Sequence, residues 1–520
     1  MRFTPLRARH CTTHACRLSI IAACVCGTSS AWAGDTIYLG NGTTLDYSFT
    51  IGYGIGIRTR SPSGNLLTPA NANGDDGDRN FKAGKLIENQ VSLLGEANLK
   101  HDDWGFFLRA DAFYNQVYNR PNYNDSPNTV NHSGAYNQFT GTASYYMGER
   151  PELLAAYGYK TFHIGSTALN VRLGQQVIAW GESVFFPNIA GAQGPSNVVK
   201  STVAGAEVKD ILLPVPQISA QWRINPTVSL LAYWQFAFQP NQLNAPGSYF
   251  SASDIVGPGA QYLIGPHGTI IPRGADIKPN NLDQWGIGAR WRVAGDTELG
   301  AYYLHYNDMN PSVVSSYAPT PVYQEKYFDH MRLTGLSFST DIGGANVAGE
   351  TSYRQRAAVL VNTPAGPTPT RADVWQTNLS AIYSIGPTFL AASQTLTGEV
   401  SFVHTGSVSP VGGSTTLYNT RNAAAFELAW TLSYKNVMSG WDLDVPITYA
   451  DAFTGQSALV GALGSLTGVG DHRVTAGLTF TRLSRLKLAL VYAKYLGTPD
   501  QKLRPLADRD YLLATATYSF

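Results

Sequence analysis

Apolar and polar residues alternate one by one along many short runs of the chain. From Leu45 to Ile57 every odd position is apolar, while the even positions hold Asp, Ser, Thr and three glycines. Successive side chains of a β-strand point to opposite faces, so a period of two predicts a strand with one apolar and one polar face. The pattern returns at Phe426–Tyr434 and Trp441–Tyr449, which are separated only by KNVMSG, a length that suits a tight turn. Further alternating runs are Trp104–Tyr118, Leu169–Val177, Val228–Phe238, Trp285–Val293, Glu298–Tyr306, Trp375–Ile385, Glu399–His404, Arg473–Phe480 and Leu486–Tyr495.

These runs have about the length of a tilted strand that crosses a bilayer, roughly 9–11 residues. Only 14% of the residues are charged, against about 25% in soluble domains. Strands with one lipid-facing and one lumen-facing row explain this low value. A soluble sandwich is the alternative, but its polar faces would be rich in Lys and Glu rather than Ser, Thr and Gly. We therefore predict an all-β fold, a transmembrane antiparallel β-barrel of about 16 strands, with a range of roughly 14–18.

The first 33 residues have the pattern of a secretory signal peptide. Four arginines and no acidic residue precede or flank the apolar stretch LSIIAACVCG, and an A-x-A cleavage motif ends at Ala33. A lipoprotein box ending at Cys24 is the alternative. All four cysteines lie in this leader, so the predicted barrel domain, residues 34–520, contains no disulfide or thiolate metal site. Without the leader, 33 basic residues face 36 acidic ones, a formal charge of −3, and nucleic acid is not an expected partner.

Three long stretches interrupt the alternation. In the first, residues 61–81, the carboxylates of Asp75, Asp76 and Asp78 could bind calcium, but their spacing does not match the EF-hand, so we expect a solvated or lumen-facing turn. The second covers residues 179–216. The third, residues 240–283, is rich in Pro and Gly and predicts a long loop that either folds inward or stands outside the barrel.

Segment 179–216 is too apolar for an exposed loop and too irregular for strands. A loop of this length with several aromatic residues is expected to be ordered, and an irregular backbone is tolerated inside a barrel, where protein or water surrounds it. We therefore predict that it fills the lumen or caps one mouth. The candidate residues of the substrate path or lumen are Trp180, Glu182, Phe185, Phe186, Glu207 and Lys209. For the charged candidates, pairing with wall arginines such as Arg172, Arg290 and Arg292 is the alternative to contact with a substrate.

The last residues, YLLATATYSF, alternate as well and predict the closing strand of the barrel. Pairing of this strand with Leu45–Ile57 would leave no exposed sheet edge. Tyr518 and Phe520 fall on the expected lipid-facing row. Phe520 at the end of such a strand resembles the signal by which the barrel assembly machinery recognises outer-membrane barrels.

Four motifs follow one another along the chain: DDGDRNF (75–81), GQQVIAWGES (174–183), GAEVKDILLPVP (205–216) and PGSYFSASD (246–254). With them the chain resembles the proteobacterial outer-membrane family catalogued as domain of unknown function thirteen-oh-two. It departs from that family at Asp78-Arg79-Asn80, where asparagine-leucine-asparagine is typical. The resemblance implies a barrel that helps hydrophobic small molecules, such as steroid-like, aromatic or fatty compounds, to cross the outer membrane. It implies no catalytic residues.

The sequence therefore predicts a non-enzymatic channel or carrier for hydrophobic or amphipathic small molecules in the outer membrane of a Gram-negative bacterium, without a cofactor. Apolar solutes need apolar walls, which segment 179–216 could supply. A general diffusion porin is the first alternative, and an outer-membrane lipid hydrolase, which needs a Ser–His pair, is a weaker one. Expected partners are outer-membrane lipid, the barrel assembly machinery and a small hydrophobic ligand. A periplasmic or lipoprotein transport partner is a further option.

Overall fold

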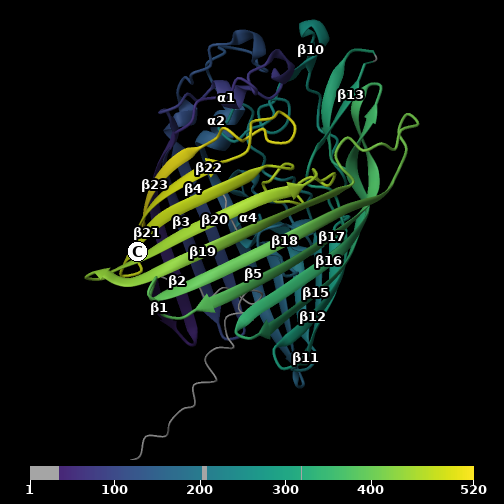
Figure 1. The fold of residues 1–520 in the computed structure, drawn as a ribbon. Helices are drawn as coiled ribbons and strands as arrows, with labels where there is room; N and C mark the ends of the chain where they lie inside the picture. The colour runs from purple at the N-terminus through teal and green to yellow at the C-terminus, as the bar shows by residue number, and fades with distance from the viewer. Residues whose placement is uncertain (1–33, 202–207, 318) are drawn as a thin grey trace, which may run out of the picture.

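The computed structural model describes residues 34–201, 208–317 and 319–520 of the chain. In this part of the chain eighteen antiparallel strands close into a barrel (Figure 1). Each barrel strand pairs with the barrel strands before and after it along the chain, and the last pairs with the first. The eighteen strands are β2 (Thr43–Arg58), β3 (Leu86–His101), β4 (Trp104–Asn115), β5 (Glu149–Ile164), β6 (Thr167–Gln176), β7 (Val215–Arg223), β8 (Val228–Gln235), β11 (Trp285–Ala294), β12 (Thr297–Tyr306), β15 (Met331–Ile342), β16 (Ala345–Thr363), β17 (Gly366–Ile385), β18 (Ser393–Val408), β19 (Asn422–Met438), β20 (Trp441–Thr454), β21 (His472–Arg482), β22 (Leu486–Tyr495) and β23 (Tyr511–Ser519).

The barrel has 18 strands rather than the predicted number of about 16. Alternation is weak in some of the observed strands, of which β15 and β16 are examples. In β15 the inward-facing Met331 and Leu333 are buried in an apolar core while Arg332 and Thr334 face outward, so this end of the strand reverses the usual pattern. In β16 a bulge between Arg354 and Ala357 adds one residue to the register and shifts the alternation by one position. A count based on a strict period of two therefore falls short.

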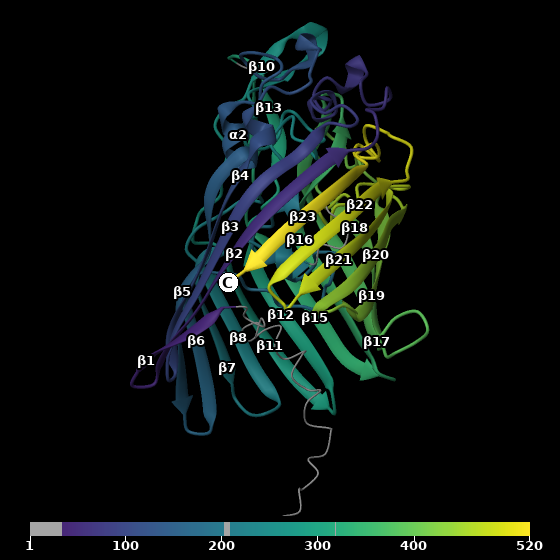
Figure 2. The same cartoon turned by 90° about the vertical axis from the view of Figure 1, so that its left-hand side faces the viewer.

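The predicted closing strand is confirmed. β23 pairs with β2 from Thr50↔Ser519 to Arg58↔Tyr511 (Figure 2). The first residues of β2 pair instead with a short strand, β1 (Asp35–Gly40), from Gly40↔Thr43 to Asp35↔Tyr47. β1 and β23 thus lie one after the other along the same edge of β2, because its other edge is taken by β3.

The two ends of the barrel differ. At one end strands are joined by short turns, such as Asp102-Asp103 and Gly343-Gly344, whereas long connections at the other end include 59–85, 116–148, 177–214 and 236–284. We call the long-loop end the outer end, because barrels of this type have short periplasmic turns and long extracellular loops. The smaller elements in the connections are η2 (Pro69–Asn71), α1 (Asp76–Arg79), η3 (Gln116–Asn119), η4 (Pro127–Thr129), α2 (Gly141–Gly148), η5 (Ala190–Ala192), α3 (Val198–Ser201), α4 (Val208–Ile211), β9 (Tyr262–Ile264), η6 (Pro266–Gly268), β10 (Ile270–Pro272), β13 (Ser312–Ser316) and β14 (Val322–Lys326).

The outer face of the wall is apolar. Large apolar side chains such as Tyr53, Leu93, Leu379, Phe402 and Leu490 are exposed on it, one residue in two along their strands. An apolar belt around a closed barrel is the surface that lipid covers. Among the described residues, no helix is long and apolar enough to cross a membrane.

Candidate functional site: a cavity beside the segment that fills the lumen

The connection between β6 and β7 lies inside the barrel. We call its described residues, 177–201 and 208–214, the inner segment. Trp180, Phe186 and Ile189 of this segment are 5%, 1% and 0% exposed and belong to one apolar core with wall residues such as Tyr233 of β8 and Leu333 of β15. The core shows that the segment packs against the wall rather than lining a wide water-filled pore.

Trp180 anchors the start of the inner segment. Its indole ring stacks on Tyr302 of β12 with a centroid distance of 5.9 Å and meets the edge of Tyr233 at 5.1 Å. Phe185 and Phe186 are buried in the same core. The aromatic candidates predicted from the sequence therefore come together in space, and aromatic pairs of this kind add about 0.5–1.5 kcal/mol beyond the burial of their area.

Two buried carboxylates of the wall hold the backbone of the inner segment. Glu350 of β16 accepts hydrogen bonds from the backbone N–H of Glu182, from the Ser183 hydroxyl at 2.8 Å and from the backbone N–H of Ile189 at 3.0 Å. Gly181 has a φ of +99°, and a side chain there would collide with the Glu350 carboxylate. This position therefore needs glycine both for its conformation and for its space.

Glu399 of β18 holds the next three residues. One of its oxygens accepts the backbone N–H groups of Val184 at 3.2 Å, of Phe185 and of Phe186 at 2.9 Å. Its other oxygen accepts a bond from the Asn378 amide at 3.1 Å, and the same amide donates to the Phe186 carbonyl at 2.7 Å. Backbone donors thus satisfy a carboxylate that is only 3% exposed.

A third contact fixes the turn at Asn188, which is fully buried. Arg354 of β16 donates to the Asn188 carbonyl at 3.0 Å and to the Gln376 side chain at 2.8 Å. Gln376 of β17 donates to the Pro187 carbonyl at 3.0 Å. Together with the two glutamates, these residues bind the inner segment to three adjacent strands.

Of the charged candidates in the inner segment, the structure describes the side chain of Glu182 but not those of Glu207 and Lys209. Burial, with repulsion from Glu350 and Glu298, raises the pKa of Glu182 to about 7, although the positive charge of Arg290 opposes this rise. Arg290 also lies 3.7 Å from Glu298. Glu207 lies outside the described residues. Lys209 belongs to α4, and its side chain lies outside the description as well.

A cavity of about 390 Å³ lies between the inner segment and the outer loops. Pro187, Ala192 and Val198 form its inner side. The apolar lining also includes Leu243, Phe250, Met309, Met331, Leu459, Val460, Leu463, Leu466 and Leu506. The polar lining includes Asn241, Asn244, Tyr306, Asp308, Asn310, Arg354, Asn419 and Gln456. Apolar residues thus make up the larger part of the lining, and polar residues make up the rest.

Asp308 is the acidic side chain in the cavity lining and is 9% exposed. Burial raises its pKa to about 6, although the Asn310 backbone N–H, which donates to it at 2.9 Å, and the Arg354 charge oppose this rise. Near neutral pH this carboxylate therefore sits close to the point where it changes charge.

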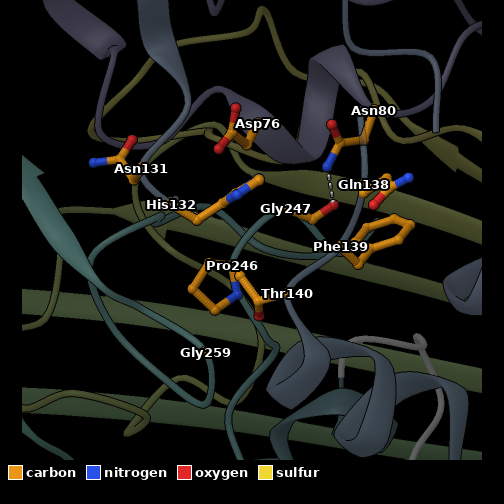
Figure 3. A pocket seen from close by; sticks show the side chains of 10 residues that line it. All are labelled: Asp76, Asn80, Asn131, His132, Gln138, Phe139, Thr140, Pro246, Gly247 and Gly259. Carbon is orange, nitrogen blue, oxygen red and sulfur yellow. Dashed lines mark hydrogen bonds between the residues drawn. The ribbon is translucent and has the colours of Figure 1, made fainter. Parts of the chain in front are cut away.

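The acidic stretch at Asp75, Asp76 and Asp78 corrects an expectation. These side chains are not in a solvated or lumen-facing turn: they are 0%, 4% and 1% exposed. Asp76 and Asp78 lie in α1, under the loop that contains Gly247. Figure 3 shows Asp76 in a small pocket with Asn80, Asn131 and Gly247. Strong burial follows from packing between loops that are distant in sequence, which local spacing does not reveal.

Tyr518 and Phe520 both remain partly exposed, at 39% and 52%. Their ring centroids are 4.8 Å apart, and the Phe520 backbone N–H donates to the Phe49 carbonyl at 2.9 Å. A role of these two residues in barrel assembly stays a prediction.

The glutamates and the cavity were not found from the sequence. Glu350 and Glu399 sit at inward positions of their strands, so a charge in a lumen-facing row was the available signal. The loop at residues 455–471 supplies much of the cavity lining, including Leu459 and Leu463. It carries no motif that marks it.

The closed barrel, the apolar outer belt and the ordered segment in the lumen define the class: an outer-membrane-type β-barrel with an internal plug. The chain belongs to the family described as "Protein of unknown function (DUF1302)", whose model matches residues 15–520. No curated protein is significantly similar to the chain in sequence.

The chain is similar to several solved structures, each at a low TM-score. Pseudomonas aeruginosa OccK2 (OpdF), in complex with glucuronate, is 12% identical, with 92% of this chain and 98% of that one covered and a TM-score of 0.42. Acinetobacter baumannii OccAB1 is 9% identical, with coverages of 92% and 96% and a TM-score of 0.44. Salmonella typhi OmpF, in complex with daunomycin, is 9% identical, with coverages of 94% and 100% and a TM-score of 0.38.

Proposed function

We propose that this protein is an outer-membrane channel or carrier for hydrophobic or amphipathic small molecules. The observation that carries the proposal is the cavity beside the inner segment, with its volume of about 390 Å³ and its mostly apolar lining. Small-molecule sites are typically about 300–1,000 Å³ and combine apolar walls with a few polar groups that fix orientation. Steroid-like, aromatic and fatty compounds are the substrate classes that match such a lining.

The packing of the inner segment supports this function over that of a general diffusion porin. A general porin offers a continuous aqueous channel. Here Trp180, Phe186 and Ile189 pack against the wall, and Glu350 and Glu399 bind the backbone between them. A solute that enters the cavity therefore meets apolar side chains, which favour the transfer of apolar surface out of water.

The polar groups of the cavity need polar partners on a bound solute. Arg354, Asp308 and Tyr306 lie together with Met309 and Met331 in the lining. A molecule with an apolar body and one polar end could satisfy both kinds of surface, whereas a purely polar sugar would leave the apolar wall uncovered. We extend the proposal to its partners: outer-membrane lipid around the barrel, the assembly machinery, and a periplasmic or lipoprotein partner that exchanges the solute.

Uptake measurements test the proposal. A strain that lacks the protein should take up radiolabelled steroid or fatty compounds several-fold more slowly, with unchanged uptake of a small sugar. Equal loss of both, or of neither, would contradict the proposal.

A single substitution sharpens the test. Val460 lines the cavity and is 58% exposed, so Val460→Lys adds a charge to the apolar wall without disturbing the core. We expect it to lower apolar uptake several-fold. Val437→Lys is the matched control, because Val437 is 41% exposed in β19 close to a turn at the opposite end. The same loss in both variants would assign the effect to charge or assembly rather than to the cavity.

A further inference from the structure

Three buried carboxylates meet where two outer loops touch. Asp75 and Asp76 come from the connection between β2 and β3, and Asp254 comes from the connection between β8 and β11. One oxygen of each lies within 4.8 Å of the others. The Asp76 backbone N–H donates to Asp254 at 3.1 Å, and the Asp254 backbone N–H donates to the Asn73 carbonyl at 2.8 Å. The geometry brings negative charges together that the chain separates by nearly 180 residues.

The charge of this cluster is not balanced by the described side chains around it. Arg79 pairs with Asp75 at 2.8 Å. The neighbouring acids differ: Asp78 pairs with Arg58 and Arg509 at 3.0 and 2.9 Å, and Asp508 pairs with Arg58 at 3.1 Å. Two arginines thus match two aspartates in that group. In the cluster of Asp75, Asp76 and Asp254, three aspartates share one arginine, which leaves two negative charges. A buried charge without a partner is costly.

Two oxygens of the cluster lack a donor. Asp75 Oδ1 and Asp254 Oδ1 are buried and have no hydrogen-bond partner within the described residues. These carboxylates are therefore hard to keep ionised without a positive partner.

A fourth side chain points to the nature of that partner. Asn131 is 2% exposed, and its amide nitrogen donates to Asn73 Oδ1 at 2.8 Å and to the Tyr262 carbonyl at 3.0 Å. Its oxygen, Oδ1, is buried without a hydrogen-bond donor among the described residues. Figure 3 shows Asn131 and Asp76 in the same pocket, and the Asn131 backbone N–H donates a hydrogen bond to the Asp76 carboxylate. Asn131 Oδ1 is thus a neutral acceptor without a donor in the pocket that also holds Asp76, and a bound cation would satisfy both oxygens.

We propose that Asp75, Asp76, Asp254 and the Asn131 side-chain oxygen bind one calcium ion between the outer loops. Oxygen-only ligands from carboxylates and an amide carbonyl suit a hard cation, and calcium accepts the irregular geometry that such loops offer. The two uncompensated charges equal the charge of the ion. Its ligands come from separate loops, so no linear calcium motif marks them. The ion would tie the β2–β3, β4–β5 and β8–β11 connections together above the barrel.

Calcium titration of the purified full-length barrel tests the proposal. The protein is refolded in detergent without lipopolysaccharide and dialysed against EGTA, and calcium chloride is added in a calorimeter and in a thermal unfolding assay. We expect one saturable site per chain and a rise in Tm with calcium, because a ligand that binds only the folded state stabilises it. No saturable binding by the wild type would overturn the proposal.

Two matched variants locate the ion. Asp254→Asn should weaken calcium binding at least tenfold and remove the calcium-dependent rise in Tm. Asp125→Asn is the control, since the Asp125 side chain is 72% exposed and pairs with Lys82 in a neighbouring loop; it should bind calcium as the wild type does. Wild-type affinity in Asp254→Asn would overturn the proposal by placing the ion elsewhere. If that variant does not fold, Asn131→Leu replaces it, with the same expected loss and the same contrary outcome.

Discussion

Buried carboxylates occur in two regions of this barrel, and they are satisfied in different ways. In the lumen, Glu350 and Glu399 receive N–H and O–H groups of the inner segment. In the outer loops, Asp78 and Asp508 receive the guanidinium groups of Arg58 and Arg509. A carboxylate that binds a backbone specifies the path of that backbone, whereas one that binds an arginine ties two side chains together. The lumen glutamates therefore position the inner segment, whereas Asp78 and Asp508 hold the outer loops together.

The largest effect is expected from Glu399→Ala. The change leaves the buried N–H groups of Val184, Phe185 and Phe186 without their acceptor, at a cost of about 1–3 kcal/mol for each. The inner segment should loosen, so single-channel conductance in planar bilayers should rise several-fold. Glu96→Ala is the control, because Glu96 faces the lumen but pairs with Arg109 of the wall at 3.2 Å. Wild-type conductance in Glu399→Ala would show that the carboxylate does not hold the segment.

The next effect is expected from Arg58→Met. Arg58 is fully buried, and its loss leaves Asp78 and Asp508 with less positive charge than they need, at a cost of about 3–5 kcal/mol. The outer loops should become sensitive to proteolysis while conductance stays at the wild-type level. Arg485→Met, in an exposed turn at the other end, should change neither. Increased conductance in Arg58→Met would mean that the outer loops and the inner segment do not act independently.

The smallest effect is expected from Asp308→Asn, and it depends on pH. Burial raises the pKa of Asp308 from its ordinary value of 3.8 to about 6, so the folded state binds a proton more tightly than the unfolded state. The ionised carboxylate therefore costs stability above pH 6, and this cost disappears as the pH falls below it. Asp308→Asn should raise the Tm at pH 7.5 and leave it unchanged at pH 4. An equal shift at both values would refute the raised pKa.

The sequence predicted the wall of the barrel well because the alternation within each strand shows which residues face lipid and which face the lumen. The run Leu45–Ile57 lies within β2, and the final strand pairs with it as predicted. Prediction failed where tertiary contacts override the local pattern. Leu333 is apolar because it meets the inner segment, and Asp76 is buried because a loop nearly 180 residues away covers it. The aromatic candidates were found from composition, but Glu350 and Glu399 needed the fold to show what they bind.

The seam between β2 and β23 has a consequence for the order of folding. Every other pairing in the ring joins strands that follow one another along the chain, while the Thr50 and Ser519 hydroxyls that meet at this seam are 469 positions apart. Local hairpins form early, and a contact with so large a sequence separation forms late, because a long loop must close first. Until then β2 and β23 each present an open edge, which can pair with another chain. The seam is thus the step at which a growing sheet becomes a ring.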